Sequence, residues 1–311
     1  MVMPVSESGF ARALLGGPLV LDGGLSNQLA AAGYDLADEL WSARLLADAP
    51  QALVAAHRAY YAAGAEVVIT GSYQASFEGF ARRGVDRAGA ARLLASSVRL
   101  AREAAGERAT GRARWVAASV GPYGAVLADG SEYRGRYGLT VAALERFHRP
   151  RIEVLAAAGP DVLALETVPD LVEAEALVRC VRGLGVPAWL SYSIAGTRTR
   201  AGQPLAEAFA VAAEAAEVVA VGVNCCAPED VGPAVRIAAR VTGKPVVAYP
   251  NSGEGWDPQA RAWFGAPTAP AGAARGWVAD GARLVGGCCR VGPDQIAALA
   301  AEIGVDSTRA G

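Results

Sequence analysis

Eight apolar, mostly β-branched runs alternate with stretches of helical periodicity, and this alternation constrains the fold more than any other feature. The runs lie at 19–24, 67–72, 115–121, 162–168, 188–194, 218–224, 246–251 and 282–287. Helix-patterned stretches lie near 48–63, 86–105, 140–158, 171–183, 204–216, 229–242, 270–280 and 293–303. Near-continuous apolar strands, each followed by a helix, are typical of a parallel sheet that is buried on both faces.

Eight strand–helix units in a chain of 311 residues fit a (β/α)8 TIM barrel, in which the sheet closes on itself. An open doubly wound sheet is the alternative, because periodicity alone does not show closure. No linker is evident, so we predict a single α/β domain over 1–311. The irregular stretches 122–138 and 252–269 each follow a strand, which predicts that they lie at the catalytic rim. Asp48 is expected to cap the first long helix, and Gly64 to end it.

The composition excludes several classes of function. A formal net charge of -2 gives no electrostatic argument for binding nucleic acid or an acidic membrane surface. No apolar stretch approaches the roughly 20 residues of a membrane span, and the first residues lack a signal-peptide pattern. Five cysteines, an odd number with two adjacent pairs, do not resemble a disulfide framework. We therefore expect a cytoplasmic protein with small-molecule partners, no nucleic acid and no membrane.

Catalytic bases are scarce. Lys244, the only lysine, precedes a predicted strand and therefore faces away from the catalytic end of a barrel. The two histidines, His57 and His148, lie in helix-patterned stretches and are expected to be structural or on the surface. Chemistry by a Schiff base or by a Ser-His-Asp triad is therefore not expected.

Polar residues collect where the predicted strands end, which is where barrel enzymes carry their chemistry. These residues are Asp22, Thr70, Ser72, Glu166, Asn224, Cys225, Cys226, Cys288 and Cys289. The cysteines occur as GVNCC and GGCC after two strands, so both pairs project from one rim. They could be buried small hydrophobes, a labile disulfide or a zinc site.

A catalytic zinc takes three protein ligands and keeps one position open, so two pairs supply three ligands if one cysteine turns into the core. Neighbouring residues on a regular strand point to opposite faces, so two adjacent ligands need irregular backbone. Gly286 and Gly287 are expected to provide that freedom. Cys180, on a helix, is expected to be buried.

The chain contains the segments LDGGL, ITGSYQASFEGFARRG, SVGPYGAVLADGSEYRG, FHRPR, LETVPD, GVNCC, YPNSGE and LVGGCCR. Together these segments resemble the homocysteine S-methyltransferase family, most closely the bacterial branch that uses S-methylmethionine. The resemblance spans about 12–303 and implies a barrel, a homocysteine acceptor and a Zn²⁺ site of Cys225, Cys288 and Cys289. It makes Cys226 a bystander and places Asp22 and Glu166 at the amino-acid site.

The remaining rim residues suit an amino-acid thiol. Asp22 and Glu166 are candidates for its ammonium group, and the N–H groups of Gly23 and Gly24 for its carboxylate. Asp22 could instead cap a helix, and Glu166 could pair with an arginine. Asn224 is expected to orient a ligand or the adjoining loop, and Thr70 and Ser72 to line the pocket.

A sulfonium donor needs no general base at carbon, but its positive sulfur favours aromatic faces or carboxylates. Candidates on the rim are Tyr73, Tyr123, Tyr133, Tyr137 and Trp256, with Glu132, Arg134 and Asn251 for the donor's amino-acid end. We expect S-methylmethionine to be preferred over S-adenosylmethionine. Alternatives are the same fold with another donor or acceptor, such as betaine or selenohomocysteine, and a non-catalytic zinc or thiol regulator.

Overall fold

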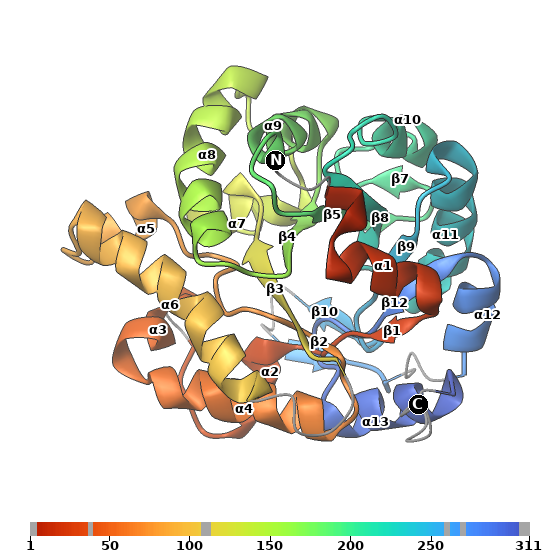
Figure 1. The fold of residues 1–311 in the computed structure, drawn as a ribbon, viewed down its shortest axis with the longest axis horizontal. Helices are drawn as coiled ribbons and strands as arrows, with labels where there is room; N and C mark the ends of the chain where they lie inside the picture. The colour runs from red at the N-terminus through yellow and green to blue at the C-terminus, as the bar shows by residue number, and fades with distance from the viewer. Residues whose placement is uncertain (1–4, 37–39, 107–112, 258–261, 268–271, 305–311) are drawn as a thin grey trace.

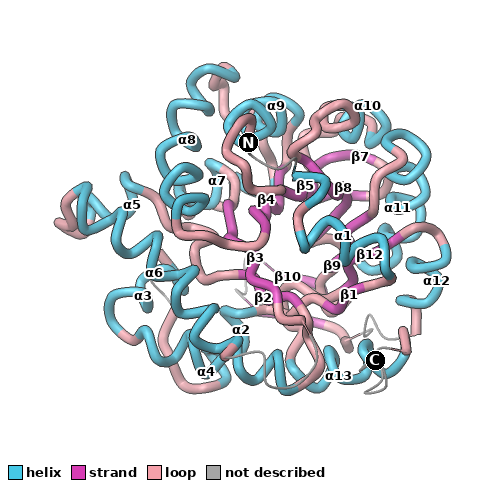
Figure 2. The backbone as a smooth tube through the Cα atoms, in the orientation of Figure 1, coloured by secondary structure: helices cyan, strands magenta, loops and turns pink. Residues whose placement is uncertain are grey.

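The computed structural model describes residues 5–36, 40–106, 113–257, 262–267 and 272–304. Figure 1 shows the ribbon coloured along the chain, and Figure 2 shows strands in the middle of the molecule with helices around them.

The main sheet has eight strands, each short and apolar. They are β1 (Leu19–Val20), β2 (Val67–Ile69), β3 (Trp115–Val120), β4 (Val162–Val168), β5 (Ala188–Tyr192), β8 (Val218–Asn224), β9 (Val246–Tyr249) and β12 (Ala282–Val285). Two antiparallel hairpins stand apart from it, β6 (Ile194–Ala195) with β7 (Arg198–Thr199), and β10 (Gly255–Asp257) with β11 (Ala262–Phe264).

Helices follow the strands of the sheet. The longer ones are α4 (Pro50–Ala62), α6 (Arg87–Ala105), α8 (Val141–Ala157), α9 (Leu171–Val181), α11 (Pro228–Thr242) and α13 (Pro293–Glu302). Shorter ones are α1 (Gly9–Gly16), α2 (Leu25–Ala31), α3 (Leu45–Asp48), α5 (Phe77–Arg82), α7 (Tyr123–Leu127), α10 (Leu205–Ala210) and α12 (Ala274–Ala279). Single 3-10 turns are η1 (Val5–Glu7), η2 (Trp41–Arg44) and η3 (Ser131–Tyr133).

The sheet closes into a barrel. Its strand order is β1-β12-β9-β8-β5-β4-β3-β2, and every neighbouring pair is parallel. The two ends meet through a parallel bridge between Leu21 and Val67, where the N–H of Asp22 donates to the Val67 carbonyl over 3.0 Å. The predicted (β/α)8 barrel is confirmed, and the open doubly wound sheet is excluded.

Two layers of core hold the barrel. One lies between the sheet and the surrounding helices, and the other fills the barrel itself. Small residues such as Ala117, Ala164 and Ala220 contribute to the core inside the barrel. Phe10 of α1 packs edge-on against Trp115, with ring centroids 5.7 Å apart. Helix α1 therefore closes the N-terminal end of the barrel, which leaves the opposite rim for chemistry.

The element bounds differ from the predicted ones in three places. The start of α4 is capped by Ala49 without a side-chain hydrogen bond, so Asp48 is not the cap. Asp48 instead ends α3 and pairs with Arg44 at 3.4 Å. Gly64 does take the left-handed conformation, with φ 101°.

The helix expected at 204–216 ends at Ala210. The irregular stretch 122–138 contains α7 and η3, and the stretch 252–269 contains the β10–β11 hairpin.

The scarce bases have structural roles. The Lys244 ammonium donates to the carbonyls of Ala212, Ala215 and Val218, each over 2.7 Å, at the N-terminal end of β9. His57 of α4 and His148 of α8 are fully buried, and His148 contacts Glu173 at 2.8 Å. No helix among the described ranges is long and apolar enough to cross a membrane.

Burial of the two histidines predicts acid sensitivity. Desolvation lowers the folded-state pKa of each to about 4, from an ordinary value of 6.5. Between these values the unfolded chain binds more protons, so stability falls as the pH drops from 6.5 towards 4. The cost is about 2 kcal/mol per histidine at pH 5. Urea unfolding at pH 7 and pH 5 should show a smaller loss in His57→Leu than in the wild type; an equal loss would contradict this assignment.

Candidate metal and amino-acid site

Three cysteines meet at the C-terminal rim of the barrel. Cys225 follows β8, and Cys288 and Cys289 follow β12. Their sulfur atoms all lie within 4.8 Å of one another, with 3.8 Å between those of Cys225 and Cys289. Hydrogen bonds fix the backbone here, because the Cys288 N–H donates to the Pro250 carbonyl and the Cys289 N–H to the side-chain oxygen of Asn251.

The irregular backbone that two adjacent thiols need arises differently from the expectation. Gly286 and Gly287 do not have positive φ angles, whereas Arg290, directly after Cys289, does, at 63°, as does Cys225 on the other segment, at 48°. The glycines instead provide space for close packing. A Cβ at Gly286 would lie 2.5 Å from the Leu21 Cβ, and one at Gly287 would lie 2.2 Å from the Val291 Cγ1. Any side chain here would therefore displace the turn that carries Cys288 and Cys289.

The sulfur spacing fits a tetrahedral metal ion. Zinc–sulfur bonds of about 2.3 Å at the tetrahedral angle place two sulfurs about 3.8 Å apart. Without an ion the three thiols share hydrogen bonds, and those from Cys225 and Cys288 hold the pKa of Cys289 well below its ordinary value. The donor set and its spacing are therefore compatible with a thiolate-bound metal.

The other cysteines lie away from this cluster. Cys226 is fully buried in the core between the sheet and the helices, on the opposite side of the chain from the Cys225 sulfur. Cys180, on α9, is also fully buried, and its thiol contacts the Glu145 carbonyl. Both are therefore core residues.

Two carboxylates lie inside the barrel mouth. Asp22 accepts a hydrogen bond from the Ile69 N–H over 2.9 Å, and its second oxygen has no partner among the described residues. Glu166, at the end of β4, accepts from the hydroxyls of Ser119 and Tyr249. Their exposed fractions are 1% and 6%. The helix-cap alternative for Asp22 fails because Gly24 caps α2, and no arginine of the described chain pairs with Glu166.

Burial dominates the electrostatics of this pair. Desolvation raises the pKa of Asp22 well above its usual range, and the charge of Glu166 raises it further. Desolvation likewise raises the pKa of Glu166 to about 7, although the Ser119 hydroxyl partly opposes it. A bound cation would relieve both costs, because it supplies the charge that the described residues do not.

Asn224 holds the segment that carries Glu166. Its side-chain oxygen accepts from the Thr167 N–H over 2.7 Å and from the Ser191 hydroxyl over 2.9 Å. Its amide nitrogen donates to the Thr167 hydroxyl over 2.7 Å. Thr167 has a left-handed φ of 58°, which is costly for a β-branched residue and is compensated by these contacts. In this conformation the Asn224 side chain therefore holds the end of β4 next to Glu166.

The other expected pocket residues also bond within the protein. The hydroxyls of Thr70 and Ser72 are 2.7 Å apart, and Ser72 donates to the Ser119 carbonyl. The Gly24 N–H donates to the Val291 carbonyl over 2.9 Å. The Gly24 N–H is therefore already bonded within the protein. Of the two glycines, only Gly23 remains a candidate to bind the carboxylate of the acceptor.

Comparison with known proteins places this site in a family. The family model described as homocysteine S-methyltransferase matches residues 19–303. A crystal structure of the homocysteine methyltransferase MmuM from Escherichia coli, in metallated form, superposes with a TM-score of 0.85 at 44% identity, covering 93% of this chain and 98% of that one. The chain belongs to the homocysteine S-methyltransferase family.

Curated relatives agree. Homocysteine S-methyltransferase YbgG from Bacillus subtilis is 43% identical over 294 residues, covering 91% of this chain and 93% of the relative. Homocysteine S-methyltransferase 4 from Zea mays is 43% identical over 319 residues, covering 96% and 93%. The resemblance found in the sequence motifs is thereby confirmed, and the chain is an enzyme of this family.

The rim aromatics of this methyltransferase divide into two groups. Tyr123 packs edge-on against Tyr137 and Phe147, with ring centroids 5.3 and 5.0 Å apart, so it supports the loop. Tyr133 faces the cysteines, with its hydroxyl 3.9 Å from the Cys225 sulfur. The side chain of Trp256 falls outside the described residues.

Sequence reasoning missed Ser119 and Tyr249, which hold Glu166. Ser191 and the ring N–H of Trp189 contact the Tyr249 hydroxyl, at 2.8 and 3.2 Å. Ser119 and Tyr249 lie near the ends of β3 and β9, so the strand-end rule that found Glu166 could have found them. It also missed Arg200, which follows the β6–β7 hairpin and had no such signal.

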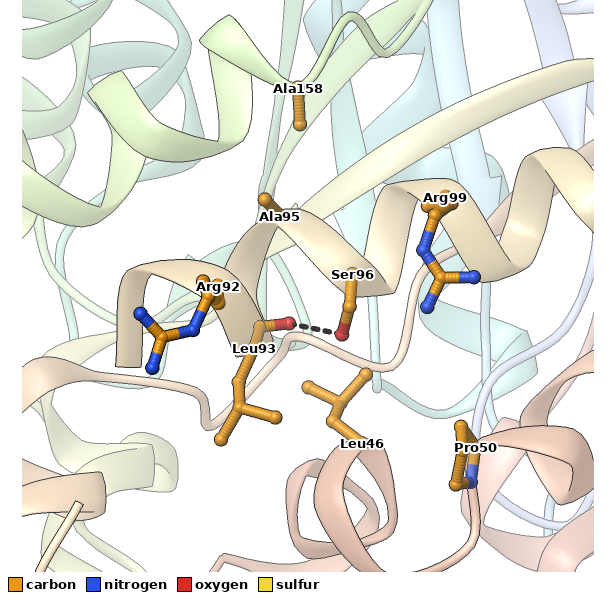
Figure 3. A pocket seen from close by; sticks show the side chains of 8 residues that line it. All are labelled: Leu46, Pro50, Arg92, Leu93, Ala95, Ser96, Arg99 and Ala158. Atoms are coloured by element: carbon orange, nitrogen blue, oxygen red, sulfur yellow. Dashed lines mark hydrogen bonds between the residues drawn. The ribbon is translucent and has the colours of Figure 1, made fainter. Parts of the chain in front are cut away.

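The other hollow of note is not a site for this chemistry. A surface groove of about 600 Å³ lies between α3, α4 and α6 on the outside of the barrel (Figure 3). Its Ser96 hydroxyl donates to the Leu93 carbonyl over 2.7 Å, and its Arg92 and Arg99 are exposed. The groove therefore offers none of the thiols or buried carboxylates that lie at the rim.

Proposed function

We propose that this enzyme transfers a methyl group from S-methylmethionine to the thiol of L-homocysteine, with Zn²⁺ held by Cys225, Cys288 and Cys289. The observation that carries the proposal is the cluster of three thiols beside two buried carboxylates that have no cation of their own. Such a set suits a substrate that bears both a thiol and an ammonium group. Thiolate ligands must stay reduced to bind a metal, which favours a reducing compartment such as the cytoplasm.

The acceptor needs its thiol deprotonated and its amino-acid end held. A free thiol has a pKa of about 8.5, and zinc, when bound, keeps such a thiol as the thiolate at neutral pH. Asp22 and Glu166 bind the ammonium through their oxygen atoms inside the barrel mouth. Ser119 and Tyr249 keep Glu166 aimed there, and Asn224 fixes the backbone next to it.

The transfer itself asks little acid–base chemistry of the protein. The homocysteine sulfur forms a bond to the methyl carbon, while the bond to the donor's sulfonium sulfur breaks and leaves its electron pair there. The products are two molecules of methionine, and the thiol proton passes to solvent. Because no proton moves at carbon, the chain needs only to position the two sulfurs, which agrees with structural roles for its buried histidines and its half-buried lysine.

Ligand identity is tested by single serine substitutions. Cys225→Ser, Cys288→Ser and Cys289→Ser should each lose zinc together with activity, because a hydroxyl is a much poorer zinc ligand than a thiolate. Cys226→Ser, the matched control, should keep both, because its side chain lies in the core. Elemental analysis of the purified variants measures the metal. Loss of zinc in Cys226→Ser with retention in Cys225→Ser would contradict the assignment.

Acceptor recognition is tested at the two carboxylates. Asp22→Asn and Glu166→Gln should keep zinc yet raise the KM for homocysteine about ten- to over a hundredfold, because a charge-assisted hydrogen bond contributes about 1.5–3 kcal/mol. Glu207→Gln, at an exposed carboxylate on α10, is the control and should change nothing. Unchanged homocysteine kinetics in both buried variants would remove Asp22 and Glu166 from the site.

Donor choice is tested by comparing kcat/KM for S-methylmethionine, S-adenosylmethionine and betaine with homocysteine as the common acceptor. S-methylmethionine should give the highest value, with S-adenosylmethionine weaker. A preference for betaine, or equal use of both sulfonium donors, would contradict the donor assignment. Absence of turnover with all three, in zinc-loaded protein, would favour the non-catalytic regulator instead.

A further inference from the structure

Arg200 lies at the rim with its position fixed but its terminal nitrogens available. Its Nε donates to the Ser193 hydroxyl over 3.2 Å, and the Ser193 hydroxyl donates to the Cys225 carbonyl over 3.1 Å. Arg200 is half-buried, and within the described chain its two terminal nitrogens donate to no acceptor. A guanidinium that is anchored through its Nε and has both terminal nitrogens available can bind a planar carboxylate.

Tyr133 connects this guanidinium to the thiol cluster. The Arg200 guanidinium carbon lies 5.7 Å from the centroid of the Tyr133 ring. The hydroxyl of the same ring lies 3.9 Å from the Cys225 sulfur. Tyr133 is 39% exposed, so a molecule arriving from solvent meets its ring before it reaches the thiols.

Glu132, the residue directly before Tyr133 in the sequence, carries the charge opposite to that of Arg200. Its exposed fraction is 8%, and one carboxylate oxygen has no partner among the described residues. Desolvation raises the pKa of this carboxyl, and the charge of Cys225 raises it further, so the carboxyl lies within electrostatic range of the thiols. A buried carboxylate oxygen without a donor is costly unless a ligand supplies one.

We propose that Glu132, Tyr133 and Arg200 form the binding site for the amino-acid end of the methyl donor. Arg200 binds its carboxylate, Glu132 binds its ammonium, and the Tyr133 ring lies along the chain that leads to the sulfonium. This rests on the function proposed above and extends it to residues of the donor site. A donor without an α-amino acid group, such as betaine, would leave the ammonium-binding oxygen of Glu132 unmatched.

The acceptor is a less suitable occupant of this site. Its ammonium already has two carboxylates, Asp22 and Glu166, deep in the barrel mouth. Arg200 and Tyr133 are more exposed than either of those residues. The two charge sets therefore suit two different amino acids that both reach the thiols.

The test uses zinc-loaded wild type, Arg200→Gln, Arg200→Lys and Glu132→Gln. The matched control is Arg198→Gln, which removes the same charge from an exposed residue of the same hairpin. Calorimetry measures binding of S-methylmethionine without homocysteine, and steady-state kinetics give KM for each substrate separately. S-methylmethionine amide, in which the carboxylate is replaced, serves as the second donor.

We expect Arg200→Gln and Glu132→Gln to weaken S-methylmethionine binding tenfold or more, with the KM for homocysteine within twofold of wild type. Arg200→Lys should bind S-methylmethionine with an affinity between those of wild type and Arg200→Gln. Arg198→Gln should bind it as tightly as wild type does. The wild type should prefer S-methylmethionine over its amide at least tenfold, and Arg200→Gln should lose that preference.

Unchanged donor binding in Arg200→Gln, a retained preference for the free carboxylate, or a rise in the KM for homocysteine instead would overturn the donor site. Failure of the proposed function looks different, because then the wild type itself does not methylate homocysteine. In that case calorimetry still decides this inference, since it asks only whether Arg200 and Glu132 bind the donor.

Discussion

Groups that ionise to anions gather at one end of the barrel, where they are buried or half-buried, and no lysine or arginine of the described chain pairs with them there. They are the thiols of Cys225, Cys288 and Cys289 and the carboxyl groups of Asp22 and Glu166. Removing such groups from water is expensive unless a positive charge accompanies them. The fold tolerates this cost because a metal ion and a substrate ammonium can supply the missing charge. The arrangement therefore serves ligand binding at the expense of the stability of the protein without ligands.

The scaffold brings these groups together through closure of the sheet. Strands β8 and β12 are separated only by β9, and the curvature of the barrel directs the residues after them towards one point. Asp22 follows β1, at the point where the Leu21–Val67 bridge closes the ring, so the same contact that completes the barrel fixes one carboxylate. Asn224 links the ends of β8 and β4 through Thr167, which couples the position of Cys225 to that of Glu166.

The sequence was sufficient for the barrel, because buried parallel strands have a near-continuous apolar pattern. It was also sufficient to bring the cysteines and the two carboxylates to one rim, because polar residues at strand ends interrupt that pattern. It was not sufficient for local backbone. Thr167 and Cys225 take left-handed conformations that no residue preference predicts, since tertiary hydrogen bonds hold them there. Aspartate is a common helix cap, yet Asp48 is the last residue of α3, and its carboxylate forms an ion pair with Arg44. Arg200 follows a hairpin outside the main sheet, so the strand-end rule could not select it.

We propose that three cysteines bind one metal ion and leave room for the thiol of the acceptor. X-ray absorption at the zinc edge of the loaded protein counts the sulfur atoms around the metal directly, at about 2.3 Å. We expect three sulfurs in wild type and in Cys226→Ser, and a fourth when homocysteine is added. Four sulfurs before the addition, with loss of one in Cys226→Ser, would contradict it, as would a sulfur count that homocysteine does not change.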